Sequence, residues 1–325
     1  MTNTTPATAA AAPTGRIERL DSRFDALVPP EATLEVLADF AKMPGAHWLE
    51  GPLWDVRTRS LLFSDVKGNT IWRWDAAGGI RPFLHPSGYT GPQPAPMEEP
   101  GSNGLTFDAQ GRLVLCEHGD RRVTRLDAEG RRTVLADRWQ GMRLNSPNDV
   151  VCRRNGELWF TDPPYGLPGR FDDPGKELPF NGVFRISPDG ALSLMLDTVQ
   201  IPNGIGFSPD EGTLYVTEGD RAWQRWLAFP LGADGTPGSG RVLFDGSGQQ
   251  GLGGPDGLVV DDRGFIFATG FERVFVLAPD GTHLGSIFPG SLTSNVAWGD
   301  DGASLFITAD HRLLRLRTTT RGAAV

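Results

Sequence analysis

The sequence predicts an all-β protein, a six-bladed β-propeller closed by an N-terminal strand. A short polar motif occurs six times, and after each copy comes an apolar strand, a polar turn and a second apolar strand. The copies lie roughly 40 to 55 residues apart, which is the period of propeller blades. A chain of 325 residues with 42 glycines and 26 prolines also fits a turn-rich protein better than a helical one. The polar residues that head the six repeats are Glu50, Asn103, Asn148, Asn203, Asp256 and Asn295.

The N-terminal residues 1–20 are rich in threonine and alanine and lack the basic start and apolar core of a secretory signal. We expect them to form a disordered tail, with residues 21–325 forming a single propeller domain. The segment from Arg23 to Pro30 is expected to dock as a helical turn. Since no signal is visible, the cytoplasm is the default location, and the periplasm stays open.

The ends of the chain predict how the propeller closes. Five repeats contain four strand candidates each, and in the first repeat these are residues 53–55, 60–64, 70–74 and 80–84. The last repeat offers only three, at residues 296–298, 304–308 and 312–317. The early segment Leu34–Ala38 resembles the strands that end other repeats. Pairing it with residues 312–317 would remove the open edge of the last blade.

Composition argues against several classes of function. The net charge is −9 and there is no basic block, so a nucleic-acid surface is not expected. No apolar run reaches the length of a membrane span. The two cysteines, Cys116 and Cys152, lie in apolar strands and are interpreted as small buried residues. Neither zinc-finger and zincin spacings nor the Gly-x-Ser-x-Gly motif of serine hydrolases occurs.

Two connections, residues 85–100 and 163–179, are too long for tight turns. Loops of this length tend to be functional lids or disordered segments. Their proline content favours semi-rigid lids, although the second loop fits plain surface decoration equally well.

The six head residues form the candidate site, because the first strand of every blade lines the central channel. They comprise two carboxylates, Glu50 and Asp256, and four amides, with no lysine or arginine. Two carboxylates brought together repel unless a cation neutralises them. Ca²⁺ suits this set because it takes about 6–8 oxygen ligands, and Zn²⁺, Mn²⁺ and Fe²⁺ remain open. The alternative is that these residues only stabilise turns, as asparagine and aspartate next to glycine or proline often do.

Four motifs carry a resemblance to a known family: Glu50-Gly-Pro-Leu-Trp, Ser146-Pro-Asn-Asp-Val, Ile201-Pro-Asn-Gly-Ile and Gly254-Pro-Asp-Gly-Leu. In this order and at blade spacing they resemble the senescence marker protein/gluconolactonase (regucalcin-like) family, over roughly residues 23–317. The bacterial gluconolactonase branch is the most similar. The resemblance implies a six-bladed propeller that hydrolyses sugar lactones, with one divalent metal in the channel, commonly calcium. The matching metal ligands are Glu50, Asn148, Asn203 and Asp256.

The leading hypothesis is therefore a metal-dependent lactonase in which water attacks an ester carbonyl polarised by the cation. Asp256 is the candidate catalytic base, and Asn103, His118 and Asn148 are candidate substrate-binding residues. The alternatives are another ester or phosphotriester hydrolase, or a non-catalytic propeller that binds calcium or a sugar. The expected partner is a small sugar lactone, and the oligomeric state is left open.

Overall fold

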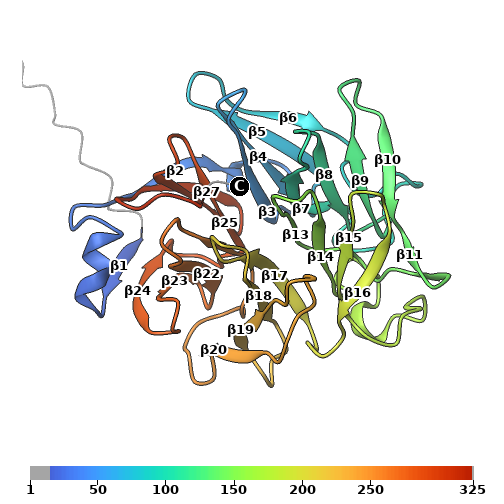
Figure 1. Ribbon diagram of the computed structural model, residues 1–325. Coiled ribbons are helices and arrows are strands. Elements are labelled where there is room, and N and C mark those ends of the chain that lie inside the picture. Colours follow the sequence, from blue (N-terminus) through green and yellow to red (C-terminus); the bar gives the residue numbers. More distant parts are fainter. Residues whose placement is uncertain (1–14, 324–325) are drawn as a thin grey trace, which may run out of the picture.

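The computed structural model describes residues 15–323. Six antiparallel β-sheets are arranged as blades around a central axis, which confirms the predicted six-bladed propeller (Figure 1). No helix among these residues is long and apolar enough to cross a membrane. The helical segments within the described range are η1 (Ser22–Ala26), η2 (Phe40–Lys42) and η3 (Arg170–Asp172).

Five blades are built from strands that are consecutive in sequence, with the first strand innermost, as the repeats predict. A short hairpin of β11 (Arg138–Trp139) and β12 (Met142–Arg143) connects the second and third blades. The strands of the first two blades are β3 (Leu49–Asp55), β4 (Ser60–Asp65), β5 (Thr70–Asp75), β6 (Gly79–Leu84), β7 (Ser102–Phe107), β8 (Leu113–Glu117), β9 (Arg122–Leu126) and β10 (Arg132–Ala136). Those of the next three are β13 (Val150–Cys152), β14 (Leu158–Asp162), β15 (Gly182–Ile186), β16 (Leu192–Leu196), β17 (Pro202–Phe207), β18 (Thr213–Glu218), β19 (Arg225–Pro230), β20 (Arg241–Asp245), β21 (Leu258–Val260), β22 (Ile266–Gly270), β23 (Arg273–Leu277) and β24 (His283–Phe288).

The sixth blade joins the two ends of the described chain. Its inner strands are β25 (Asn295–Gly299), β26 (Ser304–Ala309) and β27 (Arg312–Arg317), and its outer strand is β2 (Leu34–Asp39). β2 pairs antiparallel with β27, with Leu34 opposite Leu316 and Asp39 opposite Arg312. The predicted closure by an N-terminal strand is thus confirmed, and the edge of β27 is covered.

The fifth blade carries an additional strand that corrects a prediction. Residues 1–20 were expected to form a disordered tail, but β1 (Arg16–Arg19) pairs with β24, from Arg16 opposite Phe288 to Arg19 opposite Gly285. This pairing uses backbone hydrogen bonds, and the Arg16 guanidinium lies over the Phe288 ring, so the strand needs no apolar pattern of its own. Residues 1–14 lie outside the described range.

The hydrophobic core lies between neighbouring blades. In one cluster Phe267 of the fifth blade packs with Leu305 of the sixth, and Phe24 of η1 fills the outer end. Phe24 is fully buried, so the expected docking of this segment as a helical turn is confirmed. Cys116 and Cys152 are free and buried in a second such cluster, as predicted. Because each blade packs against its neighbours, the inner strands form a firm frame around the axis.

Candidate active site

The residues that head the repeats meet where the inner strands begin. Neighbouring blades approach so closely there that the residue after a head often has to be glycine. A Cβ on Gly51 would lie 2.1 Å from the Asn103 carbonyl oxygen, and one on Gly204 would lie 2.3 Å from that of Asp256. These contacts explain why the recurring motif pairs a polar head with glycine, and they bring the head side chains together.

Five of the six predicted heads line one cavity of about 280 Å³ at this end of the channel. The sixth head, Asn295, is used differently. Its Nδ2 donates to Glu50 Oε2 at 3.1 Å, and its Oδ1 accepts from the Val296 N–H at 2.8 Å. Asn295 therefore supports Glu50 from behind. The heads that line the cavity are Glu50, Asn103, Asn148, Asn203 and Asp256.

The three amides form a chain around the cavity. Asn103 Nδ2 donates to Asn148 Oδ1 at 2.9 Å, and Asn148 Nδ2 donates to Asn203 Oδ1 at 2.5 Å. The Oδ1 atom of Asn103 is buried without a hydrogen-bond partner. A buried oxygen without a hydrogen-bond partner lowers the stability of the folded protein unless another group or an ion binds it.

The carboxylates Glu50, which is buried, and Asp256, which is half-buried, lie in an unfavourable charge balance. Desolvation raises the pKa of both, and repulsion from Glu50 and Asp149 raises the pKa of Asp256 further. Among the described residues, the cavity lining offers only one cationic side chain, Arg170. Arg170 is already paired with Glu98 and with Glu99, which also lines the cavity.

This donor set fits a hard divalent cation. The site offers carboxylates without a compensating cation, amide oxygens, and the Asn103 oxygen that lacks a hydrogen-bond partner. Ca²⁺ takes ligands of these types. Within residues 15–323 no group of three or more His, Cys, Asp or Glu side chains is placed to hold a metal. A cation here would consequently depend on the amides as much as on the carboxylates.

Four lining residues were missed by the sequence reasoning: Trp48, Glu99, Tyr165 and Arg170. Glu99 belongs to the first long loop, whereas Tyr165 and Arg170 belong to the second. The loops meet where Arg170 Nη2 lies 3.2 Å from Glu98 Oε2 and 3.3 Å from Glu99 Oε1. Their unusual length signalled that they matter, but nothing in the sequence identified these side chains.

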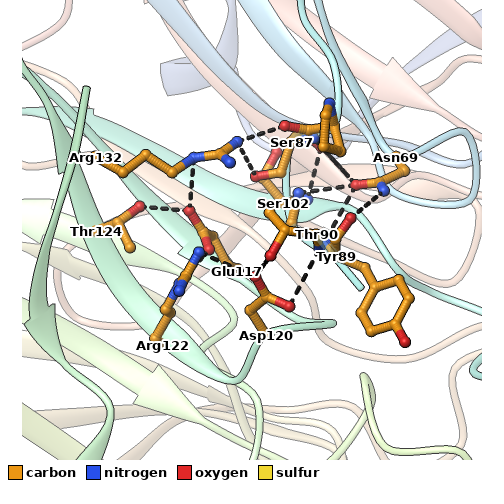
Figure 2. Close-up of polar contacts among 12 residues, drawn as sticks. Asn69, Ser87, Tyr89, Thr90, Ser102, Glu117, Asp120, Arg122, Thr124 and Arg132 are labelled. Carbon is orange, nitrogen blue, oxygen red and sulfur yellow. Dashed lines mark hydrogen bonds and ion pairs between the residues drawn. The ribbon is translucent and has the colours of Figure 1, made fainter. Parts of the chain in front are cut away.

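The first long loop is fixed at its base, as Figure 2 shows. Asn69 Oδ1 accepts the N–H groups of Ser87, Gly88 and Tyr89 at 2.8 to 3.2 Å. Farther along, Thr90 Oγ1 donates to Asp120 Oδ2 at 2.6 Å. These bonds hold the segment that leads to Glu99.

His118, a predicted substrate-binding residue, does not line the cavity. The side chain is fully buried, because Glu99 and Asn148 lie on either side of it. Its Nε2 is 3.1 Å from Asn148 Oδ1, and its Nδ1 is 3.5 Å from Glu99 Oε2. His118 thus contacts a residue of the cavity rather than the cavity itself.

Fold and site together define a six-bladed propeller with a buried site of carboxylates and amides at its axis. Residues 48–311 match the SMP-30/Gluconolactonase/LRE-like region. The chain is 39% identical to a gluconolactonase of Zymomonas mobilis subsp. mobilis, over 95% of this chain and 87% of that protein. It is 28% identical to the pentonolactonase XacC of Haloferax volcanii, with 80% of each chain covered.

The solved structure of a gluconolactonase from Xanthomonas campestris superposes with a TM-score of 0.81 at 35% identity, covering 97% of this chain and 98% of that one. The chain belongs to the SMP-30/gluconolactonase family.

Proposed function

We propose that this protein is a metal-dependent hydrolase that opens sugar lactones, as a gluconolactonase does. The observation that carries the proposal is the convergence of Glu50, Asn148, Asn203 and Asp256 around one axial cavity. The relationship to a gluconolactonase and a pentonolactonase supports sugar lactones as the substrate class.

Glu50, Asn148, Asn203 and Asp256 would hold one divalent cation. Their oxygen donors favour Ca²⁺, and the same set admits Zn²⁺, Mn²⁺ or Fe²⁺. A bound cation would supply Lewis-acid polarisation of the lactone carbonyl.

The residues of the chain would supply positioning and proton transfer. Asp256 accepts a proton from the attacking water, whose oxygen bonds to the lactone carbonyl carbon. The bond between that carbon and the ring oxygen then breaks, and the ring oxygen takes a proton to become a hydroxyl, which leaves an open hydroxy acid. Asn103 and Asn148 line the cavity, where their amides can bind substrate hydroxyls.

The loop residues Trp48, Tyr165 and Arg170 bound the cavity from outside. The volume of about 280 Å³ suits a small ligand, and desolvation of the half-buried Tyr165 raises its pKa.

The test is turnover of a panel of aldonolactones by protein treated with chelator and by protein resupplied with Ca²⁺. Calorimetry on the chelated protein should show one tight Ca²⁺ site, which Glu50→Gln and Asn203→Ala should weaken together with turnover. Folded wild-type protein that binds none of the four cations would contradict the proposal. Aryl esters and phosphotriesters in the same panel test the other hydrolase classes.

A further inference from the structure

We infer that Glu99 determines which lactones the site accepts. Its carboxylate binds the hydroxyl groups of a neutral sugar lactone, and its negative charge disfavours lactones that carry an anionic group. The inference deepens the proposed function and rests on it, because it narrows the substrate class of the same site. Glu99 acts here as a specificity-determining residue that touches the substrate.

Glu99 is the carboxylate that the first long loop contributes to the cavity lining. Its side chain is 15% exposed, whereas that of the preceding residue, Glu98, is 62% exposed. Glu98 does not line the cavity, and it pairs with Lys67 at 3.2 Å and with Arg170 at 3.2 Å. Two adjacent carboxylates of one loop therefore differ in direction, since Glu99 faces the site and Glu98 faces solvent.

The backbone next to Glu99 is held by the propeller itself. Pro100 follows directly and is buried, and a proline restricts the residue before it to extended conformations. The Gly101 N–H donates to the Val66 carbonyl at 2.8 Å, and the Gly101 carbonyl accepts from the His118 N–H at 3.1 Å. These contacts fix the position of Glu99 at the cavity, as selective binding requires.

The Glu99 carboxylate has acceptor capacity that the protein leaves unused. Within residues 15–323 its one hydrogen-bond donor is Arg170 Nη2, 3.3 Å from Oε1, and this nitrogen also lies 3.2 Å from Glu98 Oε2. The other oxygen, Oε2, is 3.5 Å from His118 Nδ1, too far for a hydrogen bond. A carboxylate offers about four lone-pair sites, so Glu99 can accept further hydrogen bonds from the hydroxyl groups of a ligand in the cavity.

The negative charge of Glu99 acts on the interior of the site. Desolvation raises the pKa of Glu50, Asp256 and Tyr165, and the charge of Glu99 raises all three pKa values further. Arg170 offsets this charge only in part, because it is 44% exposed and is shared between two carboxylates. A cation bound by the heads would neutralise Glu50 and Asp256 and leave Glu99 charged. An anionic substituent in the cavity would then meet a like charge.

The test compares two substrates on full-length, Ca²⁺-saturated protein: D-glucono-δ-lactone, and the same lactone with a phosphate on its exocyclic oxygen. Wild-type protein should have the higher kcat/KM for the neutral lactone. Glu99→Gln keeps the size of the side chain and one acceptor oxygen but removes the charge. The ratio of the two kcat/KM values should therefore fall by about 10–100-fold in this variant.

Binding is measured separately with the two corresponding lactams, in which a ring nitrogen replaces the ring oxygen and which resist hydrolysis. Calorimetry on protein that circular dichroism shows to be folded should give a ratio of Kd values that shifts in the same direction. Glu99→Ala also removes the acceptor, so it should weaken binding of the neutral lactam more than Glu99→Gln does. This measurement does not depend on turnover.

Glu98→Gln is the matched control, because Glu98 is the neighbouring carboxylate, also pairs with Arg170 and is 62% exposed. Its selectivity should stay within about twofold of wild type, since exposed charges are screened. Three results would overturn the inference alone: wild-type selectivity in folded Glu99→Gln, an equal loss in Glu98→Gln, or a wild-type preference for the phosphorylated lactone. Wild-type protein that neither hydrolyses nor binds the neutral compounds would contradict the proposed function, and the inference with it.

Discussion

Two rings of acidic side chains surround the axis, and their carboxylates differ in the groups that they contact. Glu50 is buried and Asp256 is half-buried, and both face a cavity without a free cationic side chain. A second ring ends the second strand of four blades, and its members are all buried and accept hydrogen bonds from neighbouring groups. These residues are Asp65, Glu117, Asp162 and Glu218.

Three carboxylates of the second ring hold the segments that lead to the heads. Asp65 Oδ1 accepts from the Trp48 N–H at 3.2 Å, Asp162 Oδ2 from the Asn145 N–H at 2.7 Å, and Glu218 Oε1 from the Ile201 N–H at 2.9 Å. These donors lie two or three residues before Glu50, Asn148 and Asn203. The carboxylates of the second ring thus hold the backbone around the site, whereas Glu50 and Asp256 also face the cavity.

Glu117 shows the same principle with side-chain donors (Figure 2). Its Oε2 accepts from Arg122 Nε and its Oε1 from Thr124 Oγ1, both at 2.6 Å, and Oε1 also lies 3.1 Å from Arg132 Nε. Arg132 in turn donates to the Pro86 carbonyl of the first long loop. The second ring therefore supports a loop as well as the heads.

The largest effect is expected at Asp256. Asp256→Asn keeps an oxygen near the cation but cannot accept the proton of the attacking water. At saturating cation, kcat should fall on the order of 10²–10⁴-fold, as removal of a general base does. The chelated variant should be no less stable than wild type, because the repulsion between Asp256 and Glu50 is gone.

The control for Asp256 is Asn148→Asp, which adds charge to the same ring and leaves the proposed base in place. It should retain more activity at saturating cation than Asp256→Asn. If Asp256→Asn keeps a near-wild-type kcat, Asp256 is only a ligand.

Substitutions in the second ring should lower stability more than they lower kcat. Asp162→Ala leaves the buried Asn145 N–H without its acceptor, which should lower the free energy of unfolding by about 1–3 kcal/mol. Its kcat at saturating cation should change far less than that of Asp256→Asn. Denaturant titration and steady-state kinetics measure the two effects, and a kcat loss as large as that of Asp256→Asn would remove the distinction between the rings.

A smaller effect should appear in the pH dependence of stability. Burial raises the pKa of Asp162 from 3.8 to about 7. Because the folded protein then binds the proton more tightly than the unfolded chain, stability is highest below the unfolded pKa. It falls as the pH rises through the folded pKa.

Asp162→Asn retains an acceptor but cannot titrate. Its free energy of unfolding, relative to wild type, should therefore rise between about pH 4 and pH 7 and then level off. Unfolding curves measured across this range test the sign, and parallel profiles for the two proteins would contradict it.

The sequence predicts the first ring better than the second because the heads stand at one phase of a repeat. That phase predicts the blade number and the convergence of Glu50, Asn148 and Asp256 on the axis. The second ring has an equally regular pattern, as in Phe160-Thr-Asp162 and Val216-Thr-Glu218. The hydrogen-bond partners of these acids come from turns whose positions depend on tertiary packing. No local sequence pattern encodes that packing.

The remaining differences from the prediction also arise from long-range contacts. β1 has no apolar pattern and forms only because β24 offers an edge. Glu99 and Arg170 lie on aperiodic loops that meet across more than seventy residues of chain. His118 was visible as a candidate, but its burial between Glu99 and Asn148 became clear only from the fold.

The smallest effect is expected from Arg170→Ala, at the contact between the two long loops beside the cavity. Arg170 is 44% exposed, and exposed ion pairs contribute about 0–1 kcal/mol, so Arg170→Ala should change the free energy of unfolding by no more than about 1 kcal/mol. Because the side chain lines the cavity and holds Glu99, KM for the lactone should rise a few-fold while kcat stays close to wild type. The matched control is Arg138→Ala, because the Arg138 side chain is 50% exposed and pairs with Glu177, and neither residue lines the cavity. Its KM should not change. Equal KM values for both variants would mean that the loops cover the heads without contributing to substrate binding, and that recognition lies within the ring itself.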